Sequence, residues 1–353
     1  MSISPNNPLG LNGFAFVEFT SPDPAAMRAH FERLGFVAAS RHPEKAVTRY
    51  KQGRINLLLN EEPTGQAADF RAIHGASASG MAFYVADPAA AFAAALTRGA
   101  KPAKAQDGTL GERSFVLQGI GGSHLYLVAD GHDLYADWFS VLGADAAERE
   151  NSVGLDLLDH LTHNVHRGQM RVWSDFYSRI FGFEEQKYFD IKGQATGLFS
   201  QAMIAPDKAI RIPLNESQDD RSQIEEYLRE YNGEGIQHLA LTTDDIYATV
   251  EKLKARGVQL QDTIETYYEL VDKRVPGHGE DLERLRRNRI LIDGNVGDEG
   301  ILLQIFTENL FGPIFFEIIQ RKGNEGFGNG NFQALFESIE LDQIRRGVIQ
   351  VDA

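Results

Sequence analysis

The chain repeats itself, and this repetition restricts its possible folds more than any other feature of the sequence. Residues 13–36 and 160–183 have the same length and the same order: a strand, a turn, an amphipathic helix and a closing Gly-Phe pair. Residues 80–100 and 235–258 form a second matching pair, with an Asp before the helix and an Arg-Gly after it. The sequence therefore predicts two similar halves, each built from two modules.

Each module has one helix and several strands, so one face of its sheet must be covered by a neighbouring module. We predict an α+β fold in which duplicated βαβββ-type modules form two cupped, barrel-like mixed sheets, with outer helices and a C-terminal helix. The halves should meet between Leu142 and Asn151, where large apolar residues are few. Residues 261–300 belong to the second half only, and we expect a partly helical surface excursion with a solvated charge run at 284–289.

The composition excludes several classes of partner and chemistry. The 353 residues are 42% hydrophobic, and 35 Lys and Arg against 50 Asp and Glu give a net charge of -15. This charge argues against a nucleic acid or an anionic membrane as partner, since phosphates bind basic patches. Because the chain has no cysteine, His and carboxylates are left as the metal-capable groups. We see no signal peptide and no membrane span, and expect a cytoplasmic protein.

Residues 312–321 place a carboxylate in the middle of an apolar strand. Period-two alternation puts Phe315, Glu317 and Ile319 on one face, in a strand that should end at the polar residues 320–323 with no Lys or Arg on that face. Burying an ionised Glu there is costly unless a positive charge lies against it. A metal ion would supply that charge; the alternative is a Glu on the solvent face of an edge strand.

Comparison of the two halves indicates which residues could bind such a metal. Three polar residues of the second half align with apolar residues of the first: His160 with Gly13, His238 with Phe83, and Glu317 with Leu127. If the halves fold alike, the three polar residues lie at similar depths in one cup. Two histidines and one carboxylate are the ligand set of non-haem Fe(II) oxygenases, which leaves metal positions open for other ligands.

Other patterns in the sequence carry weaker hypotheses. His160 and His166 would lie roughly 20 Å apart on one strand face, and His163 would point to the opposite face. We therefore expect His163 and His166 to be solvent-facing or hydrogen-bonded structural residues, and Asp159 to lie outside the ligand shell. Residues 326–331 lack the third glycine of a dinucleotide fingerprint. The remaining histidines have no partner at a useful spacing: His30, His42, His74, His124, His132 and His278.

Six motifs along the chain carry a family resemblance. They are Asp-His-Leu-Thr-His-Asn-Val at 159–165, Tyr-Phe-Asp-Ile-Lys-Gly at 188–193, Arg-Ile-Pro-Leu-Asn-Glu at 211–216, Gly-Glu-Gly-Ile-Gln-His at 233–238, Leu-Leu-Gln-Ile-Phe at 302–306, and Phe-Glu-Ile-Ile-Gln-Arg at 316–321 with Gly-Phe-Gly-Asn-Gly-Asn-Phe at 326–332. With these motifs the sequence resembles the 4-hydroxyphenylpyruvate dioxygenase family, of the vicinal oxygen chelate superfamily, over essentially the whole chain.

The resemblance implies a function and a set of site residues. The enzyme would convert 4-hydroxyphenylpyruvate and O2 to homogentisate and CO2 in tyrosine and phenylalanine catabolism, and would use the substrate's own keto acid. Fe(II) would be bound by His160, His238 and Glu317. Family positions for catalysis carry over to Ser200, Asn215 and Gln304. The implied substrate-binding residues are Ser200, Asn215, Gln223, Gln237, Gln304, Phe306, Phe327, Asn331 and Phe332.

One of these residues conflicts with simple strand geometry. Gln237 adjoins His238, so strict alternation would send its side chain to the opposite face of the strand. The resemblance and the strand pattern therefore make opposite predictions for this side chain.

The resemblance also implies the domain organisation. Residues 1–150 would be an N-terminal vicinal oxygen chelate domain without metal ligands. Residues 151–353 would be the catalytic domain with the Fe(II) site, and residues 331–346 would form a lid helix, because apolar residues recur there at helical spacing. A homo-oligomer is expected. Two alternatives stay open: a 4-hydroxymandelate synthase, and a non-catalytic or zinc-dependent member of the superfamily.

Overall fold

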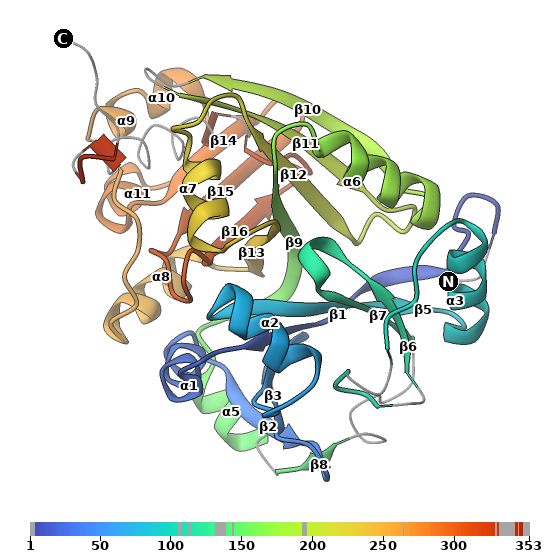
Figure 1. The fold of residues 1–353 in the computed structure, drawn as a ribbon. Helices are drawn as coiled ribbons and strands as arrows, with labels where there is room; N and C mark the ends of the chain where they lie inside the picture. The colour runs from blue at the N-terminus through green and yellow to red at the C-terminus, as the bar shows by residue number, and fades with distance from the viewer. Residues whose placement is uncertain are drawn as a thin grey trace.

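The computed structural model describes residues 4–104, 108–111, 114–130, 139–142, 145–192, 196–263, 265–328, 330–331, 343–344 and 346–348. The first half of the chain forms one eight-stranded mixed sheet and the second half forms another (Figure 1). In Figure 1 the elements from β1 to α5, blue through light green, make the lower part of the molecule, and most of those from β9 onward make the upper part. This arrangement confirms the predicted α+β class with two mixed sheets.

The elements of the first half follow the predicted order of strands and helices. They are β1 (Leu11–Thr20), α1 (Pro24–Arg33), β2 (Val37–Arg41), β3 (Val47–Gln52), β4 (Ile55–Asn60), α2 (Gln66–His74), β5 (Ser77–Val85), α3 (Pro88–Thr97), β6 (Phe115–Gln118), the 3-10 turn η2 (Ile120–Gly122), β7 (His124–Ala129), β8 (Ser140–Val141) and α5 (Asp145–Asn151). Asp23 and Asp87 cap the helices α1 and α3, and each is followed by a proline that starts the helix.

The second half has the same order with additional helices. Its elements are β9 (Leu155–Val165), α6 (Met170–Phe176), the π-helical turn η3 (Tyr177–Phe181), β10 (Glu184–Lys192), β11 (Gly197–Ile204), β12 (Arg211–Ser217), α7 (Gln223–Glu230), β13 (Gly235–Thr243), α8 (Ile246–Ala255), α9 (Glu265–Glu269), α10 (Val271–Arg274), α11 (Leu282–Asn288), β14 (Leu291–Asn295), β15 (Gly300–Phe306) and β16 (Phe315–Lys322). The predicted boundary between residues 150 and 151 lies in the last turn of α5.

Seven strands have the same topology in the two sheets, and each sheet has one further edge strand, β8 in the first and β14 at the opposite end of the second. The first sheet has the order β6-β7-β5-β1-β4-β3-β2-β8, and the second, read in the matching direction, has β14-β15-β16-β13-β9-β12-β11-β10. In each half the two central strands pair antiparallel and their outer neighbours pair parallel to them. The duplication found in the sequence is therefore a duplication of topology.

Strand pairing corrects the alignment of the two halves. In the second half, Ala240 pairs with both His160 and Glu317. In the first half, Ala82 pairs in the same way with Phe16 and Tyr126. The Gly-Phe pairs at residues 35–36 and 182–183 are not at equivalent positions, because α6 continues into the π-helical turn η3 and α1 has no such continuation. The true counterparts of His160, His238 and Glu317 are Phe16, Gly80 and Tyr126, in place of Gly13, Phe83 and Leu127.

Two β-bulges recur in both halves. In the second half, Asp159 is an extra residue of β9 between the paired Leu158 and His160, and Gln237 is an extra residue of β13 before His238. The corresponding register shifts of the first half fall at Ala15 and Ser79. A bulge residue does not follow the alternation of its strand, so both bulges redirect a side chain beside the centre of the cup.

Aromatic side chains pack the two halves against each other. Phe316, on the opposite face of β16 from Glu317, is fully buried, and its ring centroid lies 6.5 Å from that of Phe19 in the first half. Phe19 also contacts Phe311 at 5.6 Å, and Phe83 contacts Phe181 at 5.5 Å. The first half therefore covers the outer face of the second sheet and leaves its inner face to form the cup.

The insertion at residues 261–300 is more than a surface excursion, and this expectation was wrong. Its strand β14 extends the second sheet beside β15, and Tyr268 and Leu285 are fully buried. The charge run is ion-paired at the surface, with Arg284 3.0 Å from Glu251. The insertion therefore belongs to the core of the second half.

The predicted lid helix at 331–346 lies mostly outside the described residues, which include only Asn331, 343–344 and 346 of that range. Among the described residues, no helix is long and apolar enough to cross a membrane.

The cup of the first half holds a buried carboxylate, Glu18, at the counterpart of Thr162. Asn60 Nδ2 donates to Glu18 at 3.0 Å, the hydroxyls of Tyr126 and Ser79 donate at 3.2 and 3.3 Å, and the Thr109 hydroxyl also donates. Both carboxylate oxygens of Glu18 therefore accept hydrogen bonds from within the first half. Burial nevertheless raises the pKa of Glu18 above the ordinary 4.5.

This raised pKa predicts a pH-dependent stability. The folded state retains the proton of Glu18 at pH values where the unfolded chain has lost it, so the stabilisation is complete below pH 4.5 and is lost as pH rises through the folded pKa. Glu18→Gln removes this titration. Thermal unfolding of both proteins between pH 4.5 and 8 should show the difference in melting temperature shifting in favour of the variant as pH rises. A difference that does not change with pH would contradict the assignment.

Candidate metal centre

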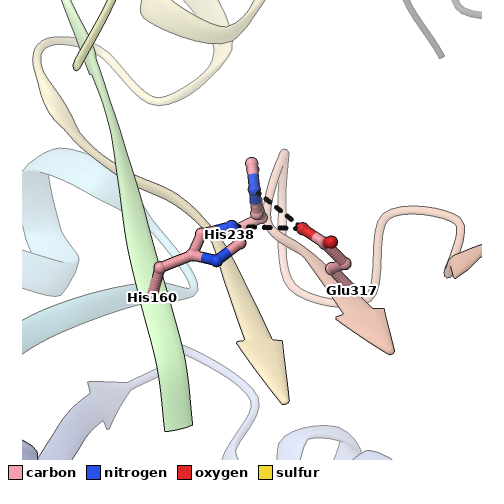
Figure 2. A group of neighbouring side chains, drawn as sticks. All are labelled: His160, His238 and Glu317. Carbon is pink, nitrogen blue, oxygen red and sulfur yellow. Dashed lines mark ion pairs between the residues drawn. The ribbon is translucent and has the colours of Figure 1, made fainter. Parts of the chain in front are cut away.

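Three buried side chains from adjacent strands of the second sheet point toward one another (Figure 2). They are His160 of β9, His238 of β13 and Glu317 of β16, and their ligand atoms lie within 4.8 Å of one another. Glu317 Oε2 is 3.2 Å from His160 Nε2 and 3.6 Å from His238 Nε2. Among the described residues this is the only group of three His or acidic side chains that could hold a metal ion. Its members are the trio singled out by the comparison of the halves.

The charge state of this cluster suits a cation. Burial by itself would raise the pKa of Glu317, but the interactions with His160 and His238 outweigh it and lower the pKa to about 2. Burial lowers the pKa of His238. An ionised carboxylate and imidazole nitrogens, all shielded from water, form a donor set that suits a divalent metal ion.

Each histidine is held by the bulge residue that precedes it. His160 Nδ1 lies 2.9 Å from Asp159 Oδ1, and His238 Nδ1 lies 3.0 Å from Gln237 Oε1. In each case the ring donates from Nδ1 and its Nε2 faces the cluster, which is how metal-binding histidines are usually oriented. The expectation that Gln237 would point away from His238 was wrong, because the bulge interrupts the alternation of β13.

The expectation that no cation shares the face of Glu317 was also wrong. β16 does not end at Gln320 but continues to Lys322, so Arg321 lies two rungs beyond Ile319 on that face. Arg321 forms a bidentate pair with Asp159, at 2.8 Å from each carboxylate oxygen. Sequence reasoning missed this pair because the two residues are distant in the chain.

A hydrogen-bonded chain holds the third member of the cluster. Gln304 Nε2 donates to Glu317 Oε1 at 2.6 Å, and Gln304 Oε1 accepts from Asn331 Nδ2 at 3.0 Å. Gly328 has a φ of +66°, and a Cβ there would lie 2.1 Å from Gln304 Oε1. Glycine is therefore required for the chain to pass this close to the amide.

The insertion supports the same chain from outside. The Tyr267 hydroxyl lies 2.8 Å from Asn331 Oδ1, and it accepts from the Ile292 amide at 2.8 Å and from Arg274. Asp293 Oδ2 accepts from the Gly330 amide at 2.9 Å. The second half thus uses its insertion to fix residues 330–331 beside Gln304.

A pocket opens onto the cluster, and His160, His238 and Glu317 form part of its lining. Four of the predicted substrate residues line it, namely Ser200, Gln304, Phe306 and Phe327. Thr162, Phe189 and Pro213 line it as well. Thr162 could have been found from the sequence, since it lies two residues from His160 on the same strand face.

Four predicted residues do not line this pocket, and a fifth is not described. Gln237 and Asn331 hydrogen-bond to His238 and Gln304, respectively. Gln223 is half-buried at the start of α7. Phe332 lies outside the described residues. Asn215 is buried on β12, beside the strand of His160.

Asn215 belongs to a group of buried polar atoms that have no hydrogen-bond partner among the described residues. Asn215 Oδ1, Thr162 Oγ1 and both amide atoms of Asn164 are in this group. Asn164 pairs with Asn215 across β9 and β12. A buried polar atom without a partner costs about 1–3 kcal/mol, a cost that a bound polar ligand would remove.

The other histidines take no part in the cluster. His163 Nε2 lies 2.8 Å from the Tyr177 hydroxyl, and burial lowers the pKa of His163 to about 3. It is a hydrogen-bonded structural residue rather than a solvent-facing one, whereas His166 is exposed. His74 Nδ1 joins the two halves at 2.7 Å from the Tyr231 carbonyl oxygen. His132 lies outside the described residues.

Comparison with known proteins gives consistent matches over the whole chain. Residues 5–145 match the family model "Hydroxyphenylpyruvate dioxygenase, HPPD, N-terminal", and residues 157–270 match "Glyoxalase/Bleomycin resistance protein/Dioxygenase superfamily". The chain is 57% identical to "4-hydroxyphenylpyruvate dioxygenase" of Pseudomonas aeruginosa, over 98% of each chain. It is 55% identical to "Hemolysin VllY" of Vibrio vulnificus, over 97% of this chain and 98% of that one. A solved mutant of 4-hydroxymandelate synthase from Streptomyces coelicolor matches with a TM-score of 0.82 and 26% identity, over 95% of this chain and 99% of that one.

The hydrogen bonds of Tyr267 generate a stability prediction with a neighbouring control. Tyr267→Phe removes the hydroxyl that joins the insertion to Asn331, and should lower the free energy of unfolding by about 1–2 kcal/mol in urea titrations. Tyr268 is buried beside it, but its hydroxyl has no hydrogen-bond partner among the described residues. Tyr268→Phe should therefore change stability by less than about 0.5 kcal/mol. Equal losses in the two variants would contradict the role given to Tyr267.

Proposed function

The chain belongs to the 4-hydroxyphenylpyruvate dioxygenase family, and from this premise we propose that it converts 4-hydroxyphenylpyruvate and O2 to homogentisate and CO2 in tyrosine and phenylalanine catabolism. Relatives of this name match the chain over nearly its full length, one of them at 57% identity. The observation that carries the proposal is that this chain also has a buried cluster of two His and one Glu in the lining of a pocket. The enzyme is then an oxidoreductase that acts on a small aromatic keto acid.

We further propose that His160, His238 and Glu317 hold Fe(II). The donor set supports this assignment, since two imidazole nitrogens and one carboxylate suit non-haem Fe(II) and leave positions open. When bound, Fe(II) would supply those open positions for the keto acid of the substrate and for dioxygen. The ligands leave one net positive charge, which the carboxylate of the substrate can balance.

The residues around the cluster would bind and orient the substrate. Ser200, Asn215 and Gln304 are the proposed catalytic residues, and the amide of Gln304 is already fixed between Glu317 and Asn331. The unpaired buried atoms of Thr162, Asn164 and Asn215 would hydrogen-bond to the polar groups of the substrate. Amide and hydroxyl groups can do so without titrating near neutral pH.

Aromatic side chains would keep water away from the reaction. Phe189, Phe306 and Phe327 line the pocket, and the ring of Phe315 stacks on that of His238 with centroids 4.7 Å apart. The described pocket lining contains no Met, so no thioether is exposed to an oxidant there. Exclusion of water and of easily oxidised groups suits an oxygenase.

Four other expectations stay predictions: a cytoplasmic location, a homo-oligomeric state, the division into domains 1–150 and 151–353, and the lid helix at 331–346.

The proposed reaction can be tested in two steps on the purified protein. Fe(II) and 4-hydroxyphenylpyruvate are first mixed with it without oxygen and without 2-oxoglutarate, and keto-acid binding should produce a visible charge-transfer band. Air is then admitted, and chromatography should identify homogentisate. 4-Hydroxymandelate as the product would favour the synthase alternative. Absence of both the band and oxygen uptake would reject the enzyme assignment, and a strict requirement for 2-oxoglutarate would indicate a different class of oxygenase.

The metal ligands can be tested by single substitutions. His160→Ala, His238→Ala and Glu317→Ala should each reduce iron bound per folded protein by at least about tenfold and abolish turnover, because each removes one of three ligands. His163→Ala, on the same strand as His160, and His166→Ala, directly after that strand, serve as controls and should retain iron, since neither side chain faces the cluster. Equal iron loss in His163→Ala and His160→Ala would overturn the ligand set.

A further inference from the structure

Arg321 connects the carboxylate that orients His160 with the loop that follows β16. On one side, its Nε and Nη2 atoms donate to the two carboxylate oxygens of Asp159, both at 2.8 Å. Asp159 in turn accepts from His160 Nδ1 at 2.9 Å. Asp159 is buried, with a side-chain exposure of 4%, and Arg321 is partly buried, with 13%. The orientation of His160 therefore depends on a carboxylate that Arg321 holds.

The other side of the same guanidinium binds the loop that follows β16. Arg321 Nη1 donates to the carbonyl oxygens of Asn324 at 2.9 Å and of Gly326 at 2.6 Å. The next residue, Phe327, lines the pocket, and its ring centroid lies 5.4 Å from that of His160 in an edge-to-face contact. One side chain thus fixes both the support of a cluster histidine and the backbone beside an aromatic wall of the pocket.

The planar fork of an arginine is needed for this arrangement. Four of its five N–H donor directions are used, two on the carboxylate and two on the loop. A lysine could supply the charge but not the four directed hydrogen bonds. Without Arg321, Asp159 would be a buried carboxylate that has lost its two strongest hydrogen bonds, and it would be free to turn away from His160.

The support of His238 lacks any such connection. Its partner Gln237 is a neutral amide on the bulge of β13, and no described hydrogen bond joins that amide to the loop. The loop after β16 therefore contacts the cluster in three places: through Arg321 and Asp159 at His160, through the ring of Phe327 at His160, and through Gly328, which packs against the Gln304 amide bound to Glu317.

We propose that Arg321 is a positioning residue that couples metal binding at His160 to the order of residues 323–328, acting through Asp159. The proposal rests on the metal centre proposed above and extends it to the wall of the pocket. Coupling of this kind is reciprocal: if the loop favours the orientation of His160 that binds metal, bound metal must stabilise the loop by the same free energy.

Cobalt(II) is a suitable probe, because its binding can be followed by visible absorption without any turnover. Co(II) titrations of Asp159→Asn and Arg321→Gln should give dissociation constants about 10- to 100-fold above that of the unaltered protein. The Co(II) dissociation constant of Arg321→Lys should lie between those of the unaltered protein and of Arg321→Gln, since lysine keeps the charge but lacks the planar guanidinium. Arg321→Lys also serves as a second variant if Arg321→Gln does not fold.

Hydrogen–deuterium exchange measures the other half of the coupling. In the unaltered protein, Co(II) should slow amide exchange in peptides covering residues 323–328. In Arg321→Gln and Asp159→Asn, saturating Co(II) should leave that exchange unchanged. Glu325→Gln is the comparison variant: it removes the 2.5 Å ion pair between the loop and Arg211, a weaker second link to Asp159, since Arg211 lies 3.7 Å from that carboxylate. It should speed loop exchange but keep Co(II) affinity within about threefold.

The outcomes separate this proposal from the one on which it rests. Failure of the unaltered protein to bind Co(II) would overturn the metal centre and the coupling together. Normal binding by the unaltered protein, with the same affinity and the same loop protection in Arg321→Gln or Arg321→Lys, would overturn the coupling alone. Faster loop exchange at unchanged Co(II) affinity would reduce Arg321 to a structural residue of the loop and would likewise overturn it.

Discussion

The buried carboxylate of Glu317 is the constraint on which the second half depends. A side chain 2% exposed and ionised must be balanced by nearby positive charge and by hydrogen-bond donors. Two imidazoles and the amide of Gln304 surround it, and they come from three different strands. The strand order of the second sheet, with β9, β13, β16 and β15 adjacent, is what allows these groups to meet.

The two bulges explain how consecutive residues on one strand can serve one centre. An unbroken strand would turn Asp159 away from His160 and Gln237 away from His238. The bulges allow each acceptor to bind the ring that follows it in the chain. The first half keeps both bulges at Ala15 and Ser79, although neither can support a histidine there. The bulges are therefore a feature of the backbone that both halves share, whereas only the second half has cluster histidines directly after them.

The two cups differ in whether their buried polar groups have hydrogen-bond partners. In the first cup, donors from four side chains saturate Glu18, and the interior is closed by its own hydrogen bonds. In the second cup, Thr162, Asn164 and Asn215 keep polar atoms without a partner among the described residues, beside an open pocket. The first half meanwhile covers the outer face of β16 through Phe19 and Phe316. Its visible contribution is to bury that face, so that Glu317 lies on a strand covered on both sides.

Much of this could be predicted from the sequence, because periodicity and repetition are local properties. They identified the duplicated α+β modules, the alternating faces of the strand around Glu317, and the three residues that cluster. The fold family and the substrate class followed from motifs, which are also local. What the sequence left undecided was register. Bulges and a π-helical turn add residues to a strand or helix without a recognisable sequence pattern. The counterparts of the cluster residues were therefore assigned to the wrong positions, and the Gln237 side chain was expected on the wrong face.

Only the tertiary structure decided which distant residues support the centre. Arg321 and Asp159 are far apart in the chain, as are Tyr267 and Asn331, and their pairing depends on the positions of strands that no local pattern specifies. By itself, the sequence determined which side chains can carry the chemistry, since residue type and spacing set what a site can bind. The fold decided which of their neighbours hold those side chains in place, because hydrogen bonds and ion pairs depend on distances that exist only after the strands have paired.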